Sequence, residues 1–69
     1  MPETGTIKTI DHERGFAFIT RTGRADVFLH VSDVARPLFE SLAVGQAVKF
    51  GTRATEKGLR ALDLGLVNE

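Results

Sequence analysis

The sequence FAFI at residues 16–19 is followed, after a glycine-containing turn, by VFLH at residues 27–30, and these two segments are the most informative about the fold of this 69-residue chain. Side chains alternate between the two faces of a strand. One face then carries the rings of Phe16, Phe18, Phe28 and His30, and the other carries the aliphatic side chains of Ala17, Ile19, Val27 and Leu29. Both faces are apolar, although the chain has no long helix with which to cover a second face. We predict that the compact aliphatic set fills a narrow barrel and that the rings face water, where they can stack planar partners.

Alternation by itself does not say which face is inside, so the opposite arrangement, with the phenylalanines as core, stays open on this pattern alone. A lone histidine on a strand, such as His30, is usually only a satisfied polar residue. The sequence RGFAFI at residues 14–19 favours the outward rings. It fits the first six positions of the RNP-type RNA-binding pattern, with isoleucine for valine, although Thr20 and Arg21 do not supply the closing aromatic residue.

The rest of the chain predicts short strands and no long helix. Strands are expected at residues 6–10, 16–20, 27–31, 46–50 and 58–66, separated by turns that contain glycine. Ser32 and Asp33 can cap one helical turn. Residues 33–45 form a longer connection, in which Pro37 argues against a central strand. Five short antiparallel strands predict an all-β domain over residues 1–69, closed or nearly closed into a barrel, because closure removes exposed edges.

Composition limits the function. The chain has no cysteine, so disulfides and thiolate metal sites are excluded, and nine basic residues balance nine acidic ones, unlike a typical nucleic-acid domain. Neither a signal sequence nor a membrane span is predicted, so we expect a cytoplasmic protein. Asp11, His12 and Glu13 follow one another in a turn and point in different directions. We therefore expect no metal site there. Ser32 and Ser41 have no base nearby in sequence, and there is no glycine-rich phosphate loop or nucleophile elbow, so we also expect no cofactor, no small-molecule substrate and no enzymatic activity.

Four blocks of sequence resemble the bacterial cold-shock domain in order and spacing. They are TGTIK at residues 4–8, RGFAFI at 14–19, DVFLHVS at 26–32 and LAVGQAVKF at 42–50, and Gly58 with Ala61 continues the match. The resemblance covers nearly the whole chain. It implies a five-stranded OB-fold barrel that binds single-stranded RNA or DNA and can act as an RNA chaperone.

The resemblance also implies which residues bind nucleic acid. The family's positions are represented here by Lys8, Arg14, Phe16, Phe18, Phe28, His30 and Phe39. Lys8 and Arg14 would face phosphates, the rings and the imidazole would stack bases, and Phe39 would close one end of the platform. Arg60 is a further candidate. With Lys49, Arg53 and Lys57 it forms either a solvated face or a rim that guides the phosphate backbone.

Three rings of the family's platform are missing. Thr9, Ile10 and Asp11 stand where the family usually has Trp-Phe-Asn, and Val31 stands where it has phenylalanine. We expect a shortened site and weaker binding than a full-platform relative shows, because each stacked base is worth about 1–3 kcal/mol. The alternative function is a protein-interaction module whose exposed apolar face docks a partner or a second copy of itself. We expect a monomer, with a homodimer as the alternative. Nucleic-acid binding should weaken steeply as salt rises, whereas an apolar protein interface should not.

Overall fold

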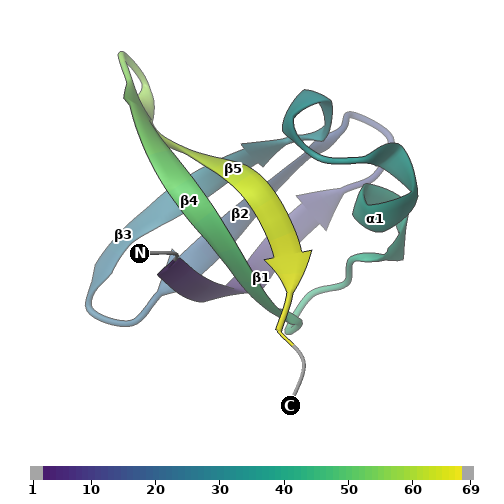
Figure 1. Cartoon of the computed structure of the whole chain (residues 1–69), viewed down its shortest axis with the longest axis horizontal. Coiled ribbons are helices and arrows are strands. Elements are labelled where there is room, and N and C mark those ends of the chain that lie inside the picture. Colours follow the sequence, from purple (N-terminus) through teal and green to yellow (C-terminus); the bar gives the residue numbers. More distant parts are fainter. Residues whose placement is uncertain (1–2, 68–69) are drawn as a thin grey trace.

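Five strands form the wall of the computed structural model, which describes residues 3–67. They are β1 (Glu3–Asp11), β2 (Phe16–Arg21), β3 (Arg24–His30), β4 (Ala47–Thr55) and β5 (Gly58–Leu66). The strands follow the order β1-β2-β3-β5-β4 around a closed barrel, so β4 returns to β1 (Figure 1). The predicted all-β, five-stranded barrel is confirmed.

Strand direction differs from the expectation at one seam. Four pairings of the barrel are antiparallel. The fifth joins β3 to β5 in parallel, through the pairing of Phe28 with Arg60. It closes the barrel between strands that are separated in sequence by a long connection and by β4. This seam brings β5 next to the outward rings of β3.

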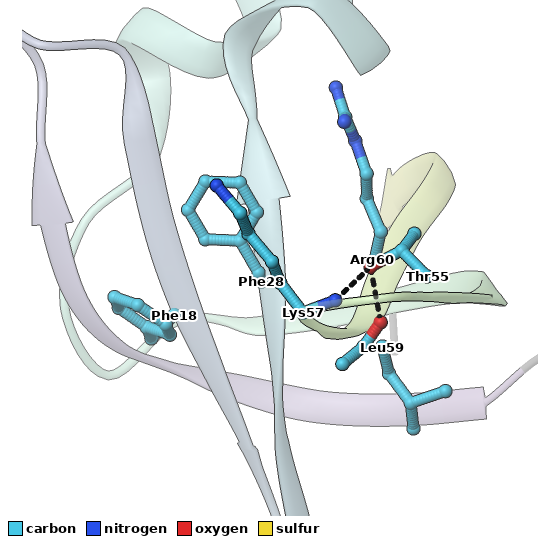
Figure 2. A pocket seen from close by; sticks show the side chains of 7 residues that line it. Phe18, Phe28, Thr55, Lys57, Leu59 and Arg60 are labelled. Atoms are coloured by element: carbon cyan, nitrogen blue, oxygen red, sulfur yellow. Dashed lines mark hydrogen bonds between the residues drawn. The ribbon is translucent and has the colours of Figure 1, made fainter.

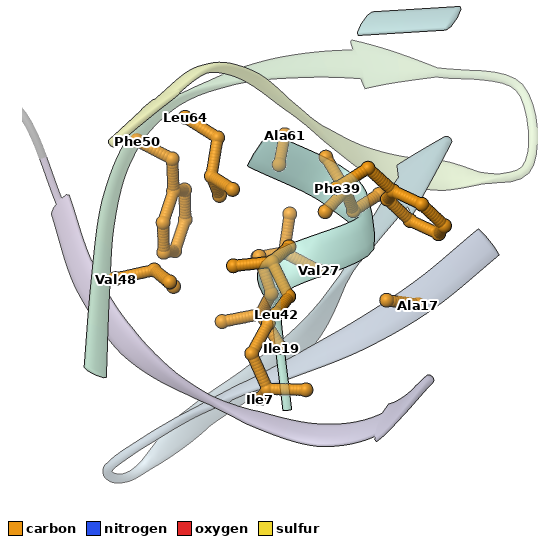
Figure 3. Packing of buried hydrophobic residues seen from close by; sticks show 11 residues of the cluster. Ile7, Ala17, Ile19, Val27, Phe39, Leu42, Val48, Phe50, Ala61 and Leu64 are labelled. Atoms are coloured by element: carbon orange, nitrogen blue, oxygen red, sulfur yellow. The ribbon is translucent and has the colours of Figure 1, made fainter. Parts of the chain in front are cut away.

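The aliphatic face of β2 and β3 lies inside the barrel. Ala17, Ile19, Val27 and Leu29 are all 0 % exposed. They pack with buried residues from the other elements, namely Ile7, Phe39, Leu42, Val48, Phe50, Ala61 and Leu64 (Figure 3). Complete burial stabilises each larger aliphatic side chain by about 1.5–3 kcal/mol. The predicted orientation of the two strands is therefore confirmed, and the phenylalanine-inside alternative is wrong for Phe16, Phe18 and Phe28.

The wall of the barrel is tight around Gly5 in β1. A Cβ atom added there would lie 2.6 Å from Ile19 Cγ2 and 2.8 Å from the Thr20 carbonyl oxygen. Both neighbours belong to β2, and one of them is a core side chain. Only glycine permits this close approach of the two strands.

The connection between β3 and β4 is more helical than the sequence indicates. It begins with the 3-10 turn η1 (Val31–Asp33) and continues into the α-helix α1 (Arg36–Ser41), which carries Pro37 in its first turn. Val31, expected at the end of a strand, instead opens η1. Phe39 and Leu42 point from the end of α1 into the core (Figure 3). In the part of the chain described, residues 3–67, no helix has the length and apolar character needed to cross a membrane.

A cluster of charges ties β1 to the turn between β2 and β3. The buried Arg21 donates from Nε to the Ala25 carbonyl at 2.9 Å and from Nη1 to Glu3 Oε1 at 2.7 Å. Arg24 Nη1 donates to the same oxygen at 2.9 Å. The hydrogen bond from Arg21 is the main reason why the pKa of the Glu3 carboxyl lies below its ordinary value. A buried guanidinium needs such partners, because burial without them is strongly unfavourable.

Candidate nucleic-acid interface

Four rings stand on the outside of the barrel wall. Phe16 and Phe18 of β2 lie opposite His30 and Phe28 of β3, respectively, in the strand register. We call these four residues the ring surface. Their outward direction follows from the burial of the residues between them, since neighbours along a strand point to opposite faces.

The rings of this surface touch one another and still expose their faces in part. The Phe18 and Phe28 centroids are 5.5 Å apart in an edge-to-face arrangement. Phe16 and Phe28 are nearly parallel at 6.2 Å, and His30 lies 6.2 Å from Phe28. Phe18 is 37 % exposed and the other three are half-buried. Such a platform offers stacking contacts to flat, unpaired bases.

A groove runs beside the ring surface. Phe18 and Phe28 form one of its sides, and the hairpin that joins β4 to β5 forms the other. The hairpin supplies Thr55, Lys57, Gly58, Leu59 and Arg60, and the groove has a volume of about 460 Å³ (Figure 2). Thr55 shapes the turn: its Oγ1 donates to the Gly58 carbonyl at 2.7 Å and accepts from the Lys57 amide at 3.3 Å. One side of the groove is aromatic, and the other brings a lysine ammonium group.

Three cations that the sequence assigned to nucleic acid are paired with acids of the chain. Lys8 Nζ lies 3.0 Å from Asp26 Oδ2, Arg14 Nε lies 3.8 Å from Asp11 Oδ2, and Arg60 pairs with Asp33. Arg14 is 80 % exposed and Lys8 is 57 % exposed. Exposed pairs of this kind are worth only about 0–1 kcal/mol. A phosphate can therefore compete for Lys8 and Arg14, although the pairing lowers the positive potential that it meets.

Phe39 is not part of the ring surface, and the expectation that it closes one end of the platform is wrong. Its side chain is 1 % exposed and belongs to the core. It packs edge-on against the His12 ring at a centroid distance of 5.6 Å, and His12 Nε2 lies 3.1 Å from the Leu42 carbonyl oxygen. The sequence assigned Phe39 to the connection between two strands but did not show whether its side chain points toward the core or toward water. In the structure, α1 directs the ring into the core.

The positions of the missing rings differ in their surroundings. Thr9 is exposed, whereas Ile10 and Val31 are half-buried and pack against the core. A shallow hollow of about 270 Å³ lies between Thr9, Phe18 and the pair formed by Lys8 and Asp26. The structure thus has a hollow at the position where the resemblance would place a tryptophan. The hollow lies on the β1 side of the ring surface.

Two residues of the site were missed by the sequence analysis, Ser32 and Asp33 of η1. Arg60 Nε donates to Asp33 Oδ2, and Arg60 Nη2 donates to Ser32 Oγ at 3.2 Å. Ser32 in turn contacts His30 through its amide and its hydroxyl. These contacts join residues 27 and 28 positions apart in the chain. No local pattern marks them, because they depend on the parallel seam between β3 and β5.

The cluster of Asp11, His12 and Glu13 does not assemble into a ligand set. Asp11 accepts a hydrogen bond from the Arg14 amide at 2.9 Å, and the imidazole of His12 faces the end of α1. Within residues 3–67 there is no group of three or more histidine, aspartate or glutamate side chains placed to hold a metal ion.

Comparison with known proteins gives a consistent result. The family model described as the 'Cold-shock' DNA-binding domain matches residues 3–67. The cold shock-like protein CspG of Shewanella violacea is 40 % identical over 62 residues, which cover 88 % of this chain and 89 % of that protein. The cold shock protein CspC of Bacillus subtilis is 39 % identical over 62 residues, 90 % of this chain and 94 % of that protein. CapB of Pseudomonas syringae is 35 % identical over 65 residues, with 94 % of each chain covered.

Proposed function

The chain belongs to the cold-shock domain family, and on that premise we propose that it binds single-stranded RNA or DNA through the ring surface. One observation carries the proposal: Phe16, Phe18, Phe28 and His30 stand together outside a barrel whose core is already filled by the aliphatic residues of the same strands. The core therefore does not require these rings. Their exposed faces suit unpaired bases, which a duplex would hide.

The surroundings of the ring surface suit the sugar-phosphate backbone. Bases stacked on Phe18 and Phe28 would leave phosphates near Lys8 on one side and Lys57 on the other. Lys8 would exchange its bond to Asp26 for a phosphate. A protein that binds only the unpaired state shifts RNA away from weak secondary structure by mass action, which is the physical basis of the proposed chaperone activity.

We propose weaker binding than relatives with all the family's rings. Each stacked base contributes about 1–3 kcal/mol, and neighbouring contacts do not add in full. Three rings are absent, at Thr9, Ile10 and Val31. Asp11 adds a negative charge near the strand's path, partly offset by its contacts to Arg14. The shortened platform and the pairing of the cations with acidic residues both lower the affinity for a single strand.

The direct test is a titration of a fluorescent oligothymidine at low salt. The double variant Phe18→Ala/Phe28→Ala should fold and lose most of its affinity. Val44→Ala is the matched control, because Val44 is another exposed apolar side chain, 65 % exposed, in the turn before β4. Normal binding by the folded double variant would refute the proposal. Oligothymidine binding should also weaken as salt rises, and binding that stays unchanged between low and high salt would argue against phosphate contacts.

We further propose that the cytoplasmic monomer is the binding unit and that it acts without catalysis or a cofactor. All four members of the ring surface belong to β2 and β3 of one barrel, so a second copy is not needed to complete it. Light scattering with and without oligothymidine tests this proposal. A complex that contains two protein copies on a strand too short for two sites would contradict it.

A further inference from the structure

The imidazole of His30 is held by the protein at one of its two nitrogens. The Ser32 backbone amide donates to His30 Nδ1 at 3.1 Å, which makes His30 the N-cap of η1. A backbone N–H can only donate, so Nδ1 carries a lone pair and not a proton. In the neutral ring the proton then lies on Nε2.

The Ser32 hydroxyl acts on the same nitrogen. Its Oγ lies 2.8 Å from His30 Nδ1 and accepts a hydrogen bond from Arg60 Nη2 at 3.2 Å. A guanidinium can only donate, so the hydroxyl accepts from Arg60 through one of its lone pairs. Because the Ser32 amide already requires a lone pair at Nδ1, the hydroxyl directs its own proton toward that same nitrogen. Two donors therefore favour the same tautomer of His30.

Arg60 is itself oriented by a carboxylate. Its Nε donates to Asp33 Oδ2, and the Asp33 side chain is 20 % exposed. Arg60 also lies opposite Phe28 in the parallel seam, which sets its backbone beside the ring surface. The order of contacts is Asp33, Arg60, Ser32, His30. In such a chain each hydrogen bond polarises the next.

The other nitrogen of His30 is free for a ligand. Among residues 3–67, no protein group bonds to His30 Nε2, and the ring lies 6.2 Å from Phe28 on the ring surface. Resting on the proposed function, we propose that Ser32 and Arg60 are positioning residues that hold His30 as its Nε2–H tautomer. His30 thereby offers a fixed donor to an acceptor oxygen of the bound strand, in a base carbonyl or a phosphate.

The role of Arg60 then differs from the contact with the phosphate backbone that its sequence position suggested. Its guanidinium makes bonds to Asp33 and Ser32 within the protein, so it acts through His30 and not chiefly through a phosphate. A fixed donor at Nε2 also implies a chemical selection. An exocyclic amino group of a base only donates hydrogen bonds, so it is disfavoured opposite Nε2–H.

Nitrogen NMR of the free protein tests the tautomer without any nucleic acid. Long-range proton–nitrogen correlation at a pH where histidine is neutral should show a pyridine-type Nδ1 and a pyrrole-type Nε2 for His30. A His12→Gln variant assigns the signals, since the chain has two histidines. Ser32→Ala removes the hydroxyl but keeps the amide donor, so it should move both shifts part of the way toward the average of the tautomers. Ser41→Ala should not, because the Ser41 hydroxyl bonds the Leu38 carbonyl in α1.

Two outcomes of these spectra would overturn the proposal. One is a protonated Nδ1 in the unaltered protein. The other is a pair of His30 shifts that stays unchanged in both Ser32→Ala and Arg60→Gln. Neither outcome depends on whether the protein binds RNA or DNA.

Titration then identifies the acceptor. An Nε2–H signal that moves with oligothymidine but not with an abasic strand of equal length assigns a base carbonyl, and one that moves with both assigns a phosphate. Arg60→Gln should weaken oligothymidine binding about threefold to tenfold, the value of one hydrogen bond. Arg53→Gln removes the same charge opposite Arg60 in the β4–β5 register and should cost about twofold or less at moderate salt.

Three results of the titration contradict the proposed roles. Equal losses in Arg60→Gln and Arg53→Gln would overturn the positioning role of Arg60. An unmoved Nε2–H signal on bound oligothymidine would overturn the donor role of His30. Failure of every strand to bind refutes the proposed function and removes the donor's ligand, while the free-protein spectra still decide the tautomer.

Discussion

Phe18 and Phe39 are both phenylalanines, but one lies on the ring surface and the other in the core. Replacing each in turn distinguishes an effect on binding from an effect on stability. Phe39 is 1 % exposed, so truncation to alanine costs about 3–5 kcal/mol. A domain of this size has about 3–10 kcal/mol of stability in total. Phe39→Ala therefore removes about a third or more of that stability, and all of it at the lower end of the range, so Phe39→Leu is the better variant. Its expected cost is about 1 kcal/mol, which lowers Tm by about 4–8 °C.

Phe18→Ala should show the reverse balance. Phe18 is 37 % exposed, and its main packing is edge-to-face, against Phe16 at 6.0 Å and Phe28 at 5.5 Å. Such contacts are worth about 0.5–1.5 kcal/mol each, so the stability loss from both is about 1–3 kcal/mol. The affinity for a single strand should fall by about 1–3 kcal/mol, which is about 5- to 150-fold.

The assay combines thermal unfolding, followed by circular dichroism, with anisotropy titration of a labelled oligothymidine. Binding is measured at low salt and at a temperature where each variant is folded. We expect Phe39→Leu to bind within about twofold of the unaltered protein, because it leaves the ring surface intact. An equal loss of affinity in Phe39→Leu and Phe18→Ala would refute the assignment of Phe39 to the core alone. Full affinity in Phe18→Ala would refute the role of the ring surface.

Three further predictions follow from charge and packing. The hydrogen bond from Arg21 is the main cause of the lowered pKa of Glu3, so the contribution of Glu3 to stability is present above its unfolded pKa and is lost as pH falls through its folded pKa. Glu3→Gln should therefore flatten the acid limb of a plot of unfolding free energy against pH. An unchanged acid limb would contradict this. Gly5→Ala should cost about 1–3 kcal/mol in denaturant unfolding, because its Cβ would lie 2.6 Å from the nearest side-chain carbon. Gly51→Ala, whose nearest neighbour would be 3.9 Å away, is the control, and equal losses would argue against a steric cause. Lys8→Gln should reduce the slope of log K against log salt by about 0.7, the value of one phosphate contact on a single strand, and an unchanged slope would exclude such a contact.

The positions of the strands were largely predictable, but their ends were not. The period-2 pattern of residues 16–19 and 27–30 is a local property, and it correctly assigned each side chain to its face. Strands β1 and β4 extend beyond the predicted residues 6–10 and 46–50. Their ends depend on pairing with neighbours, which one stretch of sequence does not contain. Helix α1 was not predicted, because a segment of six residues has little intrinsic helical stability. Its stability comes instead from tertiary packing, to which the buried Phe39 contributes.

The candidate site divides in the same way. Phe16, Phe18, Phe28 and His30 could be assigned from alternation and the RNP-type pattern, because their common face is set within two adjacent strands. Phe39 could not be placed, because its direction depends on how α1 packs on the barrel.

By itself, the sequence determined an all-β chain with rings on one face of two strands and aliphatic residues on the other. Closure of the barrel determined which residues from distant parts of the chain contact one another. The parallel seam between β3 and β5 sets Arg60 beside η1, where it meets Ser32 and Asp33 and, through Ser32, orients His30. Arg60 lies 27 and 28 positions from Asp33 and Ser32 along the chain, and only the closed barrel brings it within hydrogen-bonding distance of them.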